Sequence, residues 1–264
     1  MSATRSVLRA EKLCKRFGGL LAVNHVDLEL TGGSVHAVIG PNGAGKSTLL
    51  NLLAREVGAT SGRIILEDVD VTAWPQHRVA MAGVARSFQR TNVFAQFSVF
   101  ENCRLAAQSR AQHFTRWFRA AEHYAGTMSS AAQALETTGL SGRSDALAAT
   151  LSHGEQRQLE IAMALATEPR VLLLDEPLGG MGHDESARIV SLLARLAREH
   201  AILLVEHDMD AVFSLADRLT VMVDGTVLAS GSPEAIRSNA DVQRAYLGED
   251  ADGGSAVSAA ALSA

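Results

Sequence analysis

Residues 35–48 read VHAVIGPNGAGKST, a short apolar run followed by three glycines, a proline and a lysine. The apolar run at 35–39 is typical of a buried strand, and TLLNLLA, which starts at Thr48, has helical composition. The segment between them fits G-x-x-x-x-G-K-[ST], in which glycines let backbone N–H groups converge on phosphate oxygens at the positive end of a helix dipole. The sequence therefore predicts a phosphate-binding loop, or P-loop, between a strand and a helix.

This loop is a candidate binding site for ATP and Mg²⁺. Lys46 can reach the β- and γ-phosphates, and the Ser47 hydroxyl is a candidate ligand for Mg²⁺. The alternative is a glycine-rich turn of purely structural role, which the flanking strand and helix argue against. The predicted ATP contacts within the loop are Gly40, Pro41, Asn42, Gly43, Ala44, Gly45, Lys46, Ser47 and Thr48.

A second apolar run, VLLLDE at 171–176, ends in two carboxylates. We predict that Asp175 holds Mg²⁺, mainly through water, and that Glu176 orients or deprotonates the attacking water. Side chains alternate along a strand, so both acids can serve one site only if the chain turns, and Pro177 predicts such a turn. A strand end with solvated acids is the alternative, and the P-loop in the same chain argues against it.

The order of the apolar runs predicts an α/β fold with a mostly parallel sheet. Buried parallel strands read as short continuous apolar runs. Helical patterns separate several such runs, at 84–89, 171–175, 201–206 and 218–223. We expect the N-terminal runs to form an antiparallel sheet beside this core, namely 7–14, 23–30 and 34–39. From about 98 to 168 the spacing is helical throughout, which predicts a helical insertion.

Composition excludes several classes of protein. The chain has 264 residues, 47% of them apolar, which is enough for one large domain with a subdomain. A formal net charge of −5 gives no basic footprint for nucleic acid. The two cysteines, Cys14 and Cys103, lie too far apart for metal-ligand spacing, and they give no disulfide framework.

The ends of the chain carry no membrane anchor that we can recognise. The N-terminus lacks the apolar stretch of a secretory signal, and the apolar runs are too short to span a bilayer. We expect any link to a membrane to go through a partner. The Ala/Ser/Gly-rich segment at 249–264 is predicted to be a disordered tail.

The segment LSHGEQ at 151–156 makes the sequence recognisable. It resembles the signature of the ATP-binding cassette (ABC) ATPases, with a histidine in place of the first glycine. Ser152 followed by Glu155 also fits a capping box at a helix start, so capping alone is the alternative. In the family these residues contact ATP held by a second subunit, which would assign that role to Leu151, Ser152, His153, Gly154, Glu155 and Gln156.

The resemblance covers about residues 7–248 and implies a single cassette domain, 1–248, with a helical subdomain at roughly 90–168. It implies that Phe17, with Val23, contacts ATP. It further implies that Gln89 touches both Mg²⁺ and the attacking water, and that His207 contacts the γ-phosphate. The predicted catalytic group is thus Lys46, Gln89, Glu176 and His207, and the predicted metal ligands are Ser47, Gln89 and Asp175.

One position departs from the family pattern. Many members carry an aspartate six residues after the catalytic glutamate, where this chain has Gly182. We expect hydrolysis to survive, with communication between the two sites passing through the backbone or through His183 and Asp184.

The resemblance also implies partners. We expect a homodimer, or a heterodimer with a sibling ATPase, bound to integral membrane permeases at the cytoplasmic face of the inner (plasma) membrane. A substrate-binding protein would act indirectly, and no nucleic acid is expected.

The chain looks most like ATPases for uptake of branched-chain or other hydrophobic amino acids. Import of urea or short amides, lipopolysaccharide export, and a soluble role in DNA repair or translation are the alternatives. We expect the permease contact near 90–110, where Phe94, Phe97, Val99 and Phe100 form either an apolar groove or ordinary core.

Overall fold

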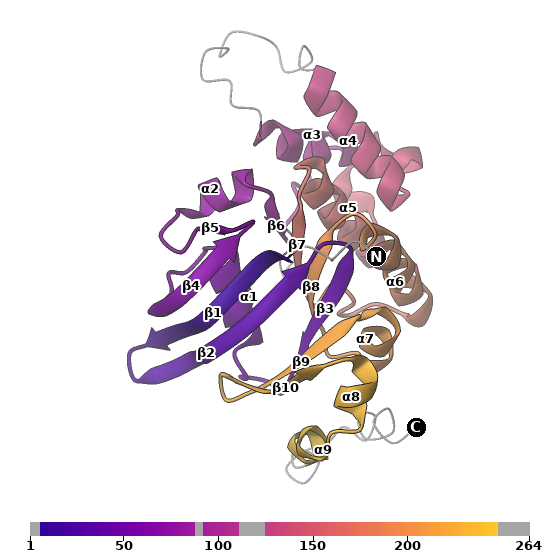
Figure 1. Cartoon of the computed structure of the whole chain (residues 1–264). Coiled ribbons are helices and arrows are strands. Elements are labelled where there is room, and N and C mark those ends of the chain that lie inside the picture. The colour runs from indigo at the N-terminus through magenta and orange to yellow at the C-terminus, as the bar shows by residue number, and fades with distance from the viewer. Residues whose placement is uncertain (1–5, 88–91, 111–124, 248–264) are drawn as a thin grey trace, which may run out of the picture.

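The central feature of the computed structural model, which describes residues 6–87, 92–110 and 125–247, is a six-stranded sheet (Figure 1). Its strand order is β10-β9-β3-β8-β7-β6, and all neighbours except β9 and β10 run parallel. These strands are β3 (Ser34–Ile39), β6 (Val84–Arg86), β7 (Val171–Asp175), β8 (Ala201–Val205), β9 (Arg218–Val223) and β10 (Thr226–Gly231). The predicted mostly parallel α/β sheet is confirmed.

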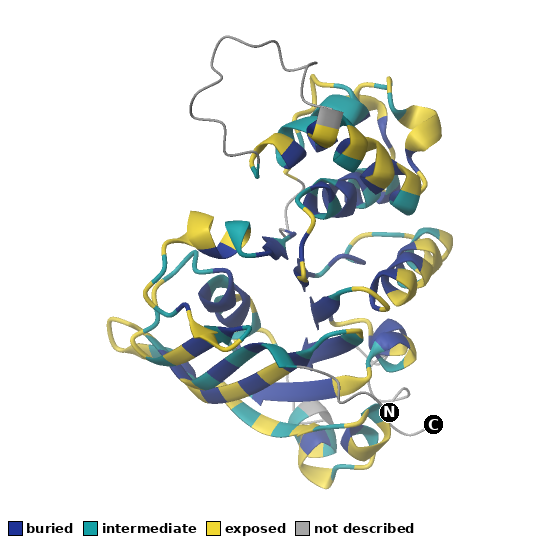
Figure 2. Cartoon of the chain, turned by 45° about the horizontal axis from the view of Figure 1, so that its top comes forward, coloured by how far each residue is buried: buried dark blue, intermediate teal, exposed yellow. Residues whose placement is uncertain are grey.

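Both faces of the central strands β3, β7 and β8 are buried (Figure 2), which explains the continuous apolar runs in the sequence. Along β7, Val171 and Leu173 pack toward helix α1 (Lys46–Leu53), whereas Leu172 and Leu174 pack into a second core. That second core is covered by α6 (His183–Leu196) and α7 (Met209–Leu215). Successive side chains of a strand point to opposite faces, so a strand with two cores needs apolar residues at every position.

A four-stranded antiparallel sheet lies on the other side of α1, in the order β2-β1-β4-β5 (Figure 1). Its strands are β1 (Ser6–Phe17), β2 (Leu20–Thr31), β4 (Ser61–Leu66) and β5 (Val69–Asp70). Leucines of α1 and apolar residues of both sheets form one continuous core. The helix is therefore held between the two sheets.

One strand assignment from the sequence is wrong. Residues 34–39 were expected in the antiparallel sheet, but β3 lies inside the parallel sheet between β8 and β9. The physical reason is burial on both faces: Val35, Ala37 and Ile39 point into one core and Val38 into the other.

His36, also on β3, connects the two sheets through hydrogen bonds. Its Nδ1 lies 3.0 Å from the carbonyl oxygen of Glu29 on β2, and its Nε2 lies 2.8 Å from the hydroxyl of Thr220 on β9. Burial lowers the pKa of His36 to about 4, so the ring is neutral at pH 7.

A group of further helices in the described part of the chain lies between β6 and β7. Helices α3 (Val99–Gln108), α4 (Ala125–Thr138) and α5 (His153–Ala166) share a separate core and extend away from the sheets at the top of Figure 1. This agrees with the predicted helical insertion. Shorter helices are α2 (Gln76–Met81), α8 (Pro233–Arg237) and α9 (Ala240–Leu247), with 3₁₀ turns at Ser141–Arg143 and Ala148–Thr150.

Both cysteines are buried as free thiols. The search for a helix of sufficient length and apolarity to cross a bilayer found none within the described ranges. The predicted tail, 249–264, lies outside the described residues.

Candidate nucleotide-binding site

The P-loop connects β3 to α1 in a conformation that only glycine permits at two critical positions. Gly43 and Gly45 have φ of 82° and 95°. A Cβ on Gly45 would lie 2.2 Å from the carbonyl oxygen of Ala22, closer than any van der Waals contact allows. The backbone itself therefore favours glycine at both positions, through the positive φ of each and, at Gly45, also through the closeness of the Ala22 carbonyl.

Lys46, the first residue of α1, folds back over the loop. Its ammonium group donates hydrogen bonds to the carbonyl oxygens of Gly40 and Pro41, at 2.5 and 2.8 Å. The charge is thereby held above the loop at the positive end of the α1 dipole, where an anion is attracted by both.

A pocket of about 520 Å³ opens above the loop. Its walls come from the hairpin of β1 and β2, from the loop itself, from Glu176 and from the turn between β9 and β10. The lining residues are Phe17, Leu20, Leu21, Ala22, Asn42, Gly43, Ala44, Gly45, Lys46, Ser47, Thr48, Glu176, Asp224 and Gly225. Phe17 presents an exposed ring at the pocket wall, as a stacking platform requires.

Val23 does not line this pocket in the described structure, although the sequence placed it there. Its side chain is fully buried in the core around α1. The register of β1 and β2 shifts between the pairs Leu13–Val26 and Lys15–Val23, so Val23 faces the same side as Val26. The neighbouring Leu21 and Ala22 line the pocket instead.

Asp175 is the last residue of β7, and its side chain lies close to Ser47 in the first turn of α1. Its Oδ1 is 3.5 Å from the Ser47 hydroxyl, and its Oδ2 is 3.3 Å from a guanidinium nitrogen of Arg86. Burial raises the pKa of Asp175, and the charge of Arg86 opposes that rise. Arg86, at the end of β6, is itself held by Glu56 at 2.8 Å and by the side chain of Asn51.

Ser47 and Asp175 suit a magnesium ion. A hydroxyl and a carboxylate are hard oxygen donors, and Mg²⁺ in phosphate sites takes few protein ligands and completes its shell with phosphate oxygens and water. No cluster of three or more His, Cys, Asp or Glu side chains with metal-binding geometry occurs in the described part of the chain. A metal at this place would therefore depend on the phosphates as well as on Ser47 and Asp175.

The chain turns after Asp175, as the sequence predicted. Glu176 has a φ of 48°, in the left-handed region that few non-glycine residues adopt. Its amide donates to the carbonyl oxygen of Val205 at 2.8 Å, and the residue lines the nucleotide pocket. The turn thus leaves Asp175 beside Ser47 while Glu176 faces the pocket, and their roles at one site stay a prediction.

Comparisons with known proteins agree with this geometry. A family model described as "ABC transporter" matches residues 23–179, and one described as "Branched-chain amino acid ATP-binding cassette transporter" matches residues 226–252. The chain belongs to the ABC transporter family. Members of its ATP-binding branch hydrolyse ATP to drive transport, and this chain is such an ATPase.

Two relatives of this ABC protein match nearly end to end. The high-affinity branched-chain amino acid transport ATP-binding protein LivG of Escherichia coli is 41% identical over 93% of this chain and 99% of its own length. BraF of Pseudomonas aeruginosa, with the same description, is 42% identical over the same shares. The ADP conformation of MJ1267, an ATP-binding cassette of an ABC transporter, has a TM-score of 0.82 at 28% identity and covers 93% of this chain and 100% of that one.

The ABC signature starts helix α5. Ser152 is the N-cap: its hydroxyl accepts from the Glu155 amide at 3.2 Å, while the Glu155 carboxylate accepts from the Ser152 amide at 2.8 Å. The Ser152 hydroxyl also lies 3.3 Å from a carboxylate oxygen of Glu185 on α6. The capping box is therefore confirmed, and contact of these residues with the ATP of a second subunit stays a prediction. None of residues 151–156 is among the described residues that line the nucleotide pocket of the same chain.

The loop after β8 carries His207, whose side chain is 68% exposed and does not line that pocket among the described residues. The residue before it, Glu206, is fully buried and accepts backbone hydrogen bonds from Leu178 and His207. Gln89 lies outside the described residues. Gly182 is the N-cap of α6.

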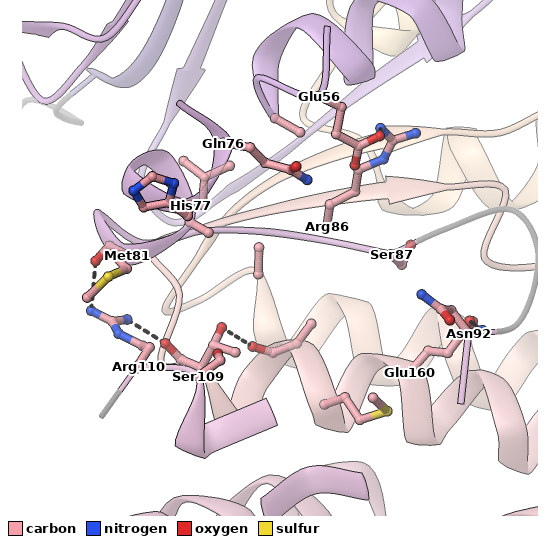
Figure 3. Close-up of a pocket in the computed structure, with 17 residues that line it drawn as sticks. Glu56, Gln76, His77, Met81, Arg86, Ser87, Asn92, Ser109, Arg110 and Glu160 are labelled. Carbon is pink, nitrogen blue, oxygen red and sulfur yellow. Dashed lines mark hydrogen bonds and ion pairs between the residues drawn. The ribbon is translucent and has the colours of Figure 1, made fainter. Parts of the chain in front are cut away.

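A second cavity, of about 370 Å³, lies between the core and the helical region (Figure 3). Arg86 and Glu56 point into it side by side from the core, and Asn92 and Glu160 meet on its opposite side, where the Glu160 carboxylate accepts from the Asn92 amide at 2.7 Å. Arg86 therefore borders this cavity and also contacts Asp175.

The aromatic cluster after Asn92 divides into two parts. Phe94 and Phe97 are about half exposed, and their rings stack with centroids 5.5 Å apart. Val99 is fully buried, and Phe100 packs against the core of the helical region. Val99 is thus core and Phe100 packs against it, whereas Phe94 and Phe97 form a partly exposed pair, and a permease groove there stays a prediction.

The sequence interpretation did not identify several residues of these sites. Arg86 and Glu206 each stand at the end of an apolar run, and a charged residue in such a position indicates a buried, paired charge. Asp224 and Gly225 reach the nucleotide pocket only through the packing of the β9–β10 turn on the P-loop, where the Gly225 amide donates to the Ala44 carbonyl at 3.1 Å. No local pattern indicates that contact.

Proposed function

We propose that this chain is the ATP-hydrolysing subunit of an importer for branched-chain or other hydrophobic amino acids. The observation that supports it is a pocket lined by the P-loop and Glu176, with Asp175 3.5 Å from the Ser47 hydroxyl, in a chain 41–42% identical to LivG and BraF. The lipopolysaccharide export protein LptB of Haemophilus influenzae is 29% identical, so similarity favours import over export.

In this proposal the site acts mainly by positioning and by electrostatics, as phosphoryl transfer requires. Amides of the P-loop and the Lys46 ammonium bind and orient the triphosphate, and Phe17 stacks on the adenine. Ser47 and Asp175, with Gln89, would hold Mg²⁺. The ion, when bound, neutralises charge on the β- and γ-phosphates.

The chemical step is assigned to two residues at neighbouring strand ends. Glu176 follows β7 and accepts a proton from, or orients, the attacking water. His207 follows β8, the next strand in the sheet, and contacts the γ-phosphate.

We further propose that a second subunit, identical or a sibling, completes each site with its own signature. This arrangement is supported by residues 151–156 standing outside the pocket of their own chain in the described structure. Permeases would dock beside Phe94 and Phe97 at the cytoplasmic face of the inner (plasma) membrane, and a substrate-binding protein would act through them.

The catalytic assignment is tested with Glu176→Gln, which keeps the shape of the side chain and removes its basicity. We expect ATP hydrolysis to fall by about 10²- to 10⁴-fold with ATP still bound. Phosphate release and calorimetry measure the two quantities. Turnover at the wild-type rate would remove Glu176 from the mechanism.

The cargo is tested by purifying the tagged chain with its membrane partners and reconstituting the complex in proteoliposomes. Uptake of labelled leucine that requires ATP supports the proposal. Uptake of urea alone, or copurification of a lipid-export complex, contradicts it.

A further inference from the structure

Glu206 is a buried carboxylate that the proposed mechanism does not use. It follows β8 directly, and its side chain has no solvent exposure. One carboxylate oxygen, Oε1, accepts a hydrogen bond from the Leu178 amide at 2.7 Å. The other, Oε2, accepts from the His207 amide at 3.1 Å and lies 3.7 Å from the Nδ1 of the His207 ring.

Burying a charged carboxylate in this position is unfavourable in free energy. Burial raises the pKa of Glu206, while the amides of Leu178, His207 and Asp208 and the nearby ring of His207 lower it. Removing a carboxylate from water costs several kcal/mol before such contacts offset it. Its two oxygens satisfy two backbone N–H groups that an apolar residue at this strand end would leave unpaired, so the carboxylate joins two separate stretches of backbone.

The two amides belong to the two loops that carry the proposed catalytic groups. Leu178 stands two residues after Glu176, in the turn where Glu176 has its positive φ. His207 is the proposed γ-phosphate contact. Since β7 and β8 are neighbours in the sheet, the two loops leave it side by side, and the carboxylate spans the gap between their backbones.

We propose that Glu206 is a positioning residue that fixes Glu176 and His207 relative to one another by holding the backbones of both loops. The inference rests on the proposed roles of Glu176 and His207. Its contribution is geometric. With both loops fixed, Glu176 and His207 approach the triphosphate in a single arrangement. Misplacement of such groups reduces the rate of the chemical step more than it reduces binding.

The test is Glu206→Gln in the full-length chain. An amide of the same shape offers one acceptor oxygen, so one of the two backbone N–H groups faces an NH₂ group instead. We expect kcat for ATP hydrolysis to fall at least tenfold while the KM for ATP changes less than threefold. In protein labelled with ¹⁵N-histidine, exchange of the His207 amide should accelerate at least tenfold.

Thr220→Val is the matched control, because it removes a buried hydrogen-bonding group away from both loops. It should lower the melting temperature while leaving kcat and exchange of the His207 amide unchanged. If both variants lose the same fraction of kcat, or if Glu206→Gln keeps the wild-type kcat, Glu206 is merely structural and the proposal is overturned.

Glu206→Asp provides the test if the glutamine variant does not fold. The aspartate keeps the charge but is one methylene shorter, so it cannot accept hydrogen bonds from both backbone amides. We expect kcat to fall at least threefold while the KM for ATP is preserved. An unchanged kcat overturns the proposal. The same experiments distinguish failure of the proposed function from failure of the Glu206 proposal. In the first case Glu176→Gln retains turnover, whereas exchange of the His207 amide still reports whether Glu206 holds the loop.

Discussion

Two helix N-termini of this ATPase, those of α1 and α5, are capped differently. Helix α1 starts after Gly45, has no side-chain cap and no acidic residue in its first turn in the described structure, and carries Lys46. Helix α5 starts after Ser152, whose capping box with Glu155 satisfies backbone groups within the chain. Glu185 lies beside the same hydroxyl, at 3.3 Å.

In the proposed two-subunit site, this difference would let the ATPase bind its substrate alone and still depend on a partner. The α1 terminus offers its amides directly to a phosphate. The α5 terminus must exchange an internal hydrogen bond for a phosphate oxygen, and carboxylates stand close to it. We therefore expect isolated chains to bind ATP well and hydrolyse it slowly.

The largest effect is expected from removing the charge at the α1 terminus. Lys46→Ala should weaken ATP binding about 100-fold, since charge-assisted hydrogen bonds contribute about 1.5–3 kcal/mol. Calorimetry measures the affinity. Lys12→Ala is a suitable control, because Lys12 is exposed and lies outside the residues described as lining the pocket, so its affinity should match the wild type.

Matched glycine substitutions compare the backbones of the two termini. Gly45→Ala should cost at least about 2 kcal/mol of folding stability, because the residue has a positive φ and its Cβ would meet the carbonyl of Ala22. In Gly154→Ala the three atoms nearest to the Cβ would all belong to Glu185, a flexible side chain that can move. Its cost should stay below about 1 kcal/mol. Chemical denaturation measures both, and equal losses would contradict the comparison.

A small effect on stability is also expected at the signature cap. Ser152→Ala should lower stability by about 1 kcal/mol through loss of the N-cap and should also slow hydrolysis. Ser232→Ala removes the N-cap of α8, where the serine accepts from the Ala235 amide, and should lose similar stability without slowing hydrolysis. If both variants hydrolyse ATP at the wild-type rate, Ser152 is only a cap.

Features encoded by contiguous residues could be predicted from the sequence. The P-loop, the turn at Glu176 and the capping box at Ser152 each depend on residues close together in the chain, and the structure shows their backbone conformations as expected. The assignment of nucleotide, metal and catalytic roles to these residues remains a prediction. The mostly parallel sheet followed from continuous apolar runs, which two buried faces require.

Features set by distant contacts could not be predicted. The run at 34–39 was assigned to the wrong sheet because its partners, β8 and β9, come more than 160 residues later. The burial of Val23 depends on a register shift against β1 that no local pattern reveals. Glu206 acquires its proposed role only through Leu178, 28 residues earlier in the chain.

The position of α1 between the two sheets has a consequence for ligand selection. Phe17 belongs to one sheet and Lys46 begins the helix that both sheets enclose, so a single core sets the distance between ring and ammonium. A ligand that touches both must have the matching length. With the contacts proposed for Phe17 and Lys46, we therefore expect the pocket to distinguish nucleotides by the number of phosphates they carry, while stacking on Phe17 selects little among the bases.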